Sequence, residues 1–128
     1  MYTRSNIIFI DIETTGLSIK NGHEITEIGY QIYNNQDVLI KEVSKIVKIN
    51  QKIPFFITKL TGITDEMCAS GSNIDDVIIE LNNDLKSCNK IVAYNILFDI
   101  TFLKYYGVIC KDIQEICCKK CLKIYYGK

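Results

Sequence analysis

Residues 7–17 read IIFIDIETTGL: an unbroken apolar run, two acids within three positions, and a polar turn. A run of β-branched and aromatic residues that ends in turn-forming residues predicts a strand. Because the run contains no polar residue before its end, we expect the strand to be buried on both faces. This stretch therefore predicts an α/β fold with residues 7–17 at the centre of the sheet.

Two carboxylates lie at the end of this strand. Side chains alternate along a strand, so Asp11 and Glu13 are expected to point from the same face. Like charges beside an apolar core raise the pKa of at least one acid unless a cation neutralises the pair. Mg²⁺ and Mn²⁺ prefer oxygen ligands, so the pair suggests a divalent cation site. The alternative is a strand that simply ends in a solvated turn.

The motif as a whole carries more information than its single residues. Asp-x-Glu-Thr-Thr-Gly-Leu after an apolar strand, residues 11–17, resembles the first motif of the DEDD superfamily of 3′-to-5′ exonucleases. The likeness is greatest to the proofreading subunits of bacterial DNA polymerase III. It implies an RNase H-like α/β fold, with a mixed five-stranded sheet and flanking helices.

A second acidic motif occurs further along the chain. AYNILFDITFL, residues 93–103, follows a predicted strand and resembles the second motif of the same exonucleases. The match includes Asn95, Phe98 and Asp99. A purely structural explanation of Asp99 is also available, because an acid in the first turn of a helix is stabilised by the helix dipole, with Asn95 as the cap. Two motifs in the family's order favour the functional interpretation.

The resemblance implies a set of site residues and a cofactor. Asp11, Glu13 and Asp99 would be catalytic and would hold two divalent cations, Mg²⁺ or Mn²⁺. LTGIT, residues 60–64, resembles a family segment that commonly reads HGIT, with Thr61 in place of the His. The residues that would contact the terminal nucleotide of the substrate are Thr14, Thr15, Gly16, Leu17, Leu60, Thr61, Asn95 and Phe98.

Composition limits the possible classes of function. The chain of 128 residues is long enough for one domain with one hydrophobic core. Fifteen basic residues balance fifteen acidic ones, so the chain lacks the positive field of a module that binds nucleic acid mainly through charge. No signal peptide or long apolar span is evident, which predicts a cytoplasmic protein without a membrane partner.

The six cysteines leave open a different interpretation, a small zinc or thiol redox protein. Cys118 and Cys121 have CxxC spacing, but no second ligand pair with suitable spacing is evident. In a reducing cytosol, disulfides are not expected. We therefore interpret the cysteines as small apolar residues on a helix.

Local patterns predict the order of the remaining elements. An Asn-rich turn at residues 34–37 joins two strands into an antiparallel hairpin. Pro54 and Gly62 bracket a short helix, Thr64 caps another, and Gly107 ends the helix that carries Asp99. The expected strands are 24–33, 38–49, 90–95 and 112–115, and the expected helices are 54–62, 64 onward, 74–88, 96–106 and 116–126.

The family's third motif, with a general base and a fourth acid, has no match before Lys128. We therefore expect 1–128 to be a single, C-terminally truncated exonuclease domain, lacking the last helix and weak or inactive by itself. His23, the only histidine, is expected to be a surface loop residue. The expected partners are nucleic acid 3′ ends, single-stranded DNA or RNA, and a polymerase subunit or a second copy. The alternative is a non-catalytic nucleic-acid-binding or polymerase-interaction module of the same fold.

Overall fold

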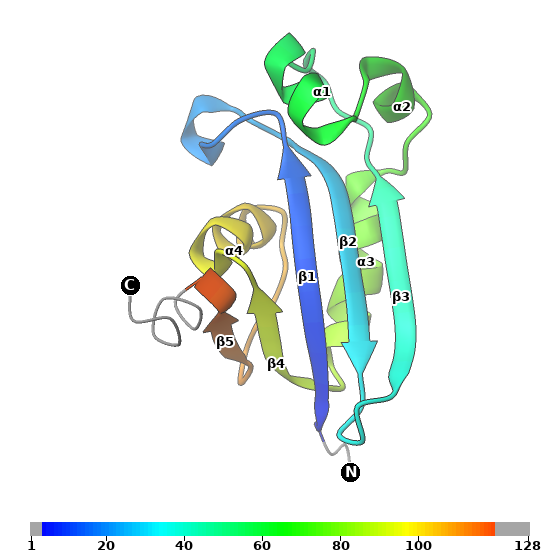
Figure 1. The fold of residues 1–128 in the computed structure, drawn as a ribbon, viewed down its shortest axis with the longest axis vertical. Coiled ribbons are helices and arrows are strands. Elements are labelled where there is room, and N and C mark those ends of the chain that lie inside the picture. Colours follow the sequence, from blue (N-terminus) through cyan, green and yellow to red (C-terminus); the bar gives the residue numbers. More distant parts are fainter. Residues whose placement is uncertain (1–3, 120–128) are drawn as a thin grey trace.

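Strand β1, Asn6–Thr14, is the central strand of a five-stranded mixed sheet. The computed structural model describes residues 4–119. The strand order is β3-β2-β1-β4-β5; β1 runs antiparallel to β2 and parallel to β4 (Figure 1). The remaining strands are β2 Ile25–Tyr33, β3 Leu39–Ile46, β4 Cys88–Ala93 and β5 Gln114–Cys117.

The helices connect these strands as an α/β fold requires. β1, β2 and β3 form an antiparallel meander, whereas β4 and β5 are reached through helical crossovers. In Figure 1, α1 and α2 lie above the sheet, at the end of β1 where the strand finishes. The helices are η1 Ile19–Asn21, α1 Phe55–Thr61, α2 Asp65–Ala69, α3 Ile74–Leu85 and α4 Ile96–Tyr105.

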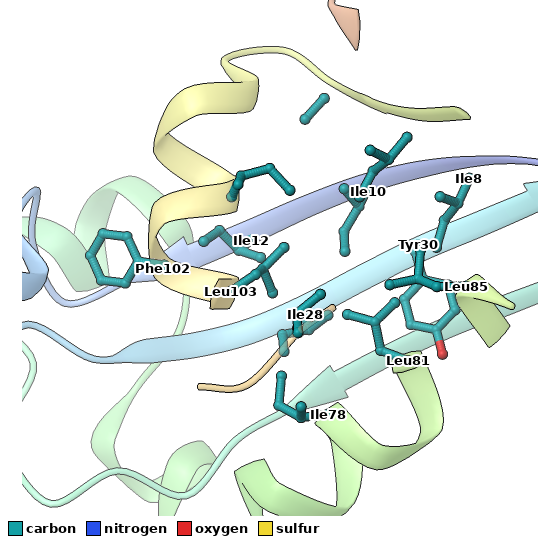
Figure 2. Close-up of a cluster of buried hydrophobic side chains, with 14 of the residues drawn as sticks. Ile8, Ile10, Ile12, Ile28, Tyr30, Ile78, Leu81, Leu85, Phe102 and Leu103 are labelled. Carbon is teal, nitrogen blue, oxygen red and sulfur yellow. The ribbon is translucent and has the colours of Figure 1, made fainter. Parts of the chain in front are cut away.

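One face of the sheet forms the hydrophobic core. Ile8, Ile10 and Ile12 alternate along β1 and point toward α3 and α4 (Figure 2). Helix α3 contributes residues at helical spacing, as the sequence predicted. These buried α3 residues are Val77, Ile78, Leu81 and Leu85.

The prediction that β1 is buried on both faces was wrong. Its burial alternates, and Phe9 is 43% exposed beside Asp11, which is also exposed. Phe9 instead packs edge-on against Tyr33 of β2, with ring centroids 5.7 Å apart. A strand with one open face can still read as an unbroken apolar run, because half-exposed aromatic and aliphatic side chains pack against their cross-strand neighbours.

Several element boundaries differ from the predictions; β3, for example, ends at Ile46 rather than at residue 49. Helix α3 ends at Leu85, so Cys88 belongs to β4 rather than to a helix. Strand β5 begins at Gln114 and includes Cys117, so the helix expected from residue 116 does not start there. Residues 118 and 119 are helical, and the rest of that predicted helix lies outside the described residues. The interpretation of all cysteines as helical was therefore also wrong.

Candidate active site at the end of the central strand

The central strand β1 extends beyond the end of its pairing with the neighbouring strand β4. Pairing between β1 and β4 ends at Phe9 and Val92, whereas β1 continues along β2 as far as Thr14. After β4 the chain turns into α4, whose first turn carries Asp99. The backbone of Ile12 lies close enough to the Asp99 carboxylate to oppose the rise in its pKa. Asp99 therefore lies against the stretch of β1 that continues beyond its pairing with β4.

Asp99 is the buried acid of the site. Only 5% of the residue is exposed. Burial, the largest cause, and the nearby negative charges of Asp11 and then Glu13 together raise its pKa to about 7, although nearby backbone N–H groups oppose the rise. Its charge is therefore costly unless a positive partner is present.

Glu13 is in a similar environment. Its pKa is raised from the ordinary glutamate value, first by burial and then by the charges of Asp11 and Glu27. Asp11 and Glu13 alternate with the core residues Ile10 and Ile12, so they share one face of β1, as predicted. The structure thus brings three carboxylates from β1 and α4 into one electrostatic environment.

The three acids influence one another through their charges, but they are not already arranged as a set of metal ligands. Within residues 4–119, no three His, Cys, Asp or Glu side chains are grouped closely enough to hold a metal ion. Of the cysteines, Cys68 and Cys88 are buried, and burial raises the pKa of both thiols. These two thiols are therefore core residues of low reactivity. Cys121 lies outside the described residues.

The loop after β1 is held by a buried threonine. The Thr15 hydroxyl donates a hydrogen bond to the side-chain oxygen of Gln51 and accepts one from the Glu24 backbone N–H at 2.9 Å. The Thr15 backbone N–H donates to the Glu24 carbonyl at 2.8 Å. The neighbouring Thr14 hydroxyl donates to the Gly16 carbonyl at 2.5 Å. Both threonine side chains and the Thr15 backbone N–H are therefore engaged within the protein.

Gln51 and Glu24 are the supporting residues that the sequence reasoning missed. The Gln51 side-chain N–H donates to the Gly22 carbonyl at 2.8 Å. The Glu24 carboxylate accepts from the backbone N–H groups of Asn50 and Gln51 at 2.9 and 3.0 Å. Together they tie the loop after β1 to the segment that leads into α1. No local pattern marks this role, since Gln51 and Thr15 are separated by 36 residues.

His23 is not the simple surface residue that we predicted. Its Nδ1 accepts a hydrogen bond from the Ser18 backbone N–H at 3.0 Å. The ring is half-buried and lies against Gly16, where a Cβ atom would come within 2.5 Å of it. The glycine of the first motif therefore allows the close approach of a side chain.

A pocket of about 330 Å³ lies between this loop and α4. Three of the predicted nucleotide-binding residues, Leu17, Asn95 and Phe98, line it together. The structural alternative for Asp99 included a cap by Asn95, but the Asn95 side chain makes no capping hydrogen bond to α4. Its backbone carbonyl accepts hydrogen bonds from the N–H groups of Phe98 and Asp99 instead. The other residues of this pocket are Ser18, Ile19, Lys20, Leu97, Thr101 and Phe102.

Two further predicted nucleotide contacts, Leu60 and Thr61, lie on α1 and do not line this pocket. Leu60 is exposed, whereas the Thr61 hydroxyl donates to the Ile57 carbonyl and accepts from the Ile63 backbone N–H. The Thr61 side chain therefore completes the end of its own helix.

A second hollow, of about 450 Å³, lies on the open face of the sheet and includes Asp11 and Glu27. Its walls also include Tyr94 and Cys118, which follow β4 and β5. Asp11 thus faces a solvent-accessible groove, whereas the buried Asp99 does not line it.

The site thus combines acidic side chains at the end of the central strand of an α/β sheet with a separate pocket between the following loop and α4. The chain belongs to the exonuclease family, whose family model matches residues 8–123. It is 35% identical over 102 residues to the 3′-5′ exonuclease DinG of Bacillus subtilis (strain 168), covering 80% of this chain and 11% of that protein. It is 28% identical over 121 residues to DNA polymerase III subunit epsilon of Buchnera aphidicola subsp. Schizaphis graminum, covering 91% and 52% respectively.

The fold has close structural neighbours. A product-bound structure of exonuclease I superposes with a TM-score of 0.82 at 17% identity, covering 97% of this chain and 32% of that one. This likeness, with the mixed five-stranded sheet, confirms the predicted RNase H-like fold. The chain spans about half of the epsilon relative and a much smaller part of the DinG relative. Among residues 4–119, no helix has the length and apolar character needed to cross a membrane.

Proposed function

We propose that this domain is a 3′-to-5′ exonuclease that hydrolyses phosphodiester bonds at the 3′ ends of DNA or RNA. The observation that carries the proposal is the placement of Asp11 and Glu13 on one face of β1 with the buried Asp99 of α4 nearby, where burial and then the charges of Asp11 and Glu13 raise the pKa of Asp99 to about 7. A folded domain retains such a cluster at a cost, since each unpaired buried charge is unfavourable. Membership of the exonuclease family supports the same function.

The chemistry of the donor set fits divalent cations. Asp11, Glu13 and Asp99 supply only oxygen ligands, which Mg²⁺ and Mn²⁺ prefer. A bound cation would remove the repulsion that raises the pKa of Asp99 and Glu13. When bound, two such ions would lower the pKa of the attacking water and stabilise the leaving 3′ oxygen. We expect the three side chains to draw together around them.

The residues of the chain would position the substrate. Leu17 and Phe98 offer apolar surface to the terminal base, and the Asn95 amide offers a donor and an acceptor in the same pocket. The Gln51 and Glu24 bonds to Thr15 hold the loop in place, so Leu17 keeps its position in the pocket. A 3′ end must leave its duplex to enter this pocket, which favours single-stranded or frayed ends.

The experiment is degradation of a 5′-labelled single-stranded oligonucleotide with Mn²⁺ by the wild-type chain, Asp11→Asn, Asp99→Asn and Asp76→Asn. Asp76 is an exposed acid on α3 and serves as the matched control. We expect stepwise shortening from the 3′ end by the wild type and by Asp76→Asn, and at least a hundredfold loss in the two site variants. Tight binding of 3′ ends without cleavage, unaffected by EDTA, would instead support the non-catalytic binding module.

A further inference from the structure

Helix α1 turns its apolar side toward solvent. Phe55, Phe56 and Leu60 are 74, 68 and 81% exposed, whereas only Ile57 of its apolar residues packs against the small core beneath it. At 100° per residue, residues 55, 56, 59 and 60 fall within an arc of about 140°. We call these four residues, Phe55, Phe56, Lys59 and Leu60, the aromatic face of α1. Large apolar residues gathered on one exposed face usually mark a binding surface.

The aromatic face also carries positive charge. The Lys59 ammonium lies 5.3 Å from the centroid of the Phe55 ring, within the range of a cation–π interaction. Lys52, just before the helix, is exposed as well. Aromatic rings that stack bases, next to cations that contact phosphates, are how proteins bind single-stranded nucleic acid without reading its sequence. A protein partner would use the apolar surface but would not need the lysines.

The aromatic face is connected to the candidate active site. Gln51 receives the hydrogen bond of the Thr15 hydroxyl, and Thr15 follows Glu13 by two residues. From Gln51 to Phe55 the chain spans at most about 14 Å. In Figure 1, α1 lies beyond the end of β1 that carries the acids. A strand whose 3′ end occupies the site therefore has α1 within a few nucleotides of that end.

We propose that the aromatic face of α1 is a stacking platform for the bases that lie 5′ of the terminal nucleotide. This inference rests on the proposed exonuclease function and extends it from the terminal nucleotide to the strand that enters the site. Phe55 and Phe56 supply the rings, and Lys59 and Lys52 contact the phosphates between the stacked bases.

The test is fluorescence anisotropy with a labelled ten-nucleotide oligothymidylate, in EDTA so that the strand is not cut. Phe55→Ala and Phe56→Ala should each weaken binding roughly 5- to 150-fold, the usual range for loss of one base–aromatic stack. Phe55→Trp should bind like the wild type, whereas Phe55→Leu, which keeps the apolar bulk, should be as weak as Phe55→Ala. Ile79→Ala removes a residue 67% exposed on α3 and should not change binding.

Equal affinity of Phe55→Leu and the wild type would overturn the inference, because a ring would then not be required. A concentration-dependent dimer abolished by Phe55→Ala, with unchanged oligonucleotide affinity, would assign the face to a second copy and overturn it too. Wild type that cleaves while the alanine variants bind normally would refute the platform and leave the exonuclease function standing. Ring-dependent binding by a wild-type chain that never cleaves the strand would support the platform and refute the exonuclease function.

Discussion

The imidazole of His23 occupies the space that a Cβ atom on Gly16 would need, since that atom would lie 2.5 Å from the ring. The ring is held there by the hydrogen bond from the Ser18 backbone N–H to Nδ1. Gly16 is therefore required for a close contact and not for a left-handed backbone, because its φ is not positive. The turn of the first motif and the loop that follows it are packed as one unit.

Gly16→Ala is expected to lower the free energy of unfolding by about 1–3 kcal/mol, because the methyl group would overpack against His23. Urea unfolding would measure the change. In a His23→Ala background the same substitution should cost much less. Gly29→Ala is the control, since a Cβ atom there would meet only ordinary contacts at 3.8 Å or more. An equal loss in both backgrounds would show that the ring is not the cause.

Thr15→Val should destabilise the loop after β1 without changing side-chain volume greatly. The substitution removes the acceptor for the Glu24 N–H and the donor for Gln51, and an unsatisfied buried group costs about 1–3 kcal/mol. Thermal unfolding would measure the loss. Ser70→Ala removes an exposed hydroxyl that bonds only within its own segment, and it should have little effect. Similar losses in the two variants would contradict a special role for Thr15.

The raised pKa of Asp99 predicts how stability depends on pH without metal. The folded protein holds a proton on Asp99 up to about pH 7, whereas the unfolded chain releases it near the ordinary value of 3.8. The folded state therefore binds more protons in this range, and the free energy of unfolding should fall as pH rises from about 4 to about 7. Glu13 acts in the same direction.

Urea unfolding in EDTA at a series of pH values would measure this slope. Asp99→Asn should flatten it, because the amide does not titrate, whereas Asp76→Asn should keep it. A wild-type curve that matches Asp99→Asn across this range would show that Asp99 titrates normally.

Divalent cations should stabilise the folded domain. Binding to the native state alone adds about 2.7 kcal/mol at a hundredfold excess over Kd, so Mg²⁺ or Mn²⁺ should raise the melting temperature and EDTA should reverse the rise. The increase should be largest near neutral pH, where the acids are charged. Asp11→Asn should reduce it, whereas Glu66→Gln, an exposed acid on α2, should not. A melting temperature that does not respond to either ion would argue against a cation site.

Much of the fold could be predicted from local sequence patterns. The hairpin at residues 34–37, the Thr64 cap and the Gly62 end of α1 are all present, because turns and caps depend on a few adjacent residues. Asp11 and Glu13 share a face because the period of a strand is two. Boundaries were predicted less well: Cys88 and Cys117 lie in strands because their pairing partners, not their neighbours in sequence, decide the conformation.

The candidate site was predicted in part. Leu17, Asn95 and Phe98 meet in one pocket, whereas the side chains of Thr15 and Thr61 are used within the protein. The roles of Gln51, Glu24 and His23 were not foreseen, because each depends on a contact between a loop residue and a partner set by the fold.

The sequence by itself determined the central strand, the alternation that puts two acids on one face, and the order of the motifs, since these follow from local periodicity and from residue types. Only the tertiary structure decided that one face of β1 stays open and that Asp99 reaches Ile12 where the pairing with β4 ends. It also decided that Gln51 anchors the loop of the first motif. These features depend on strand order and on where each ladder stops, which are set by the packing of the whole core rather than by any short stretch of chain.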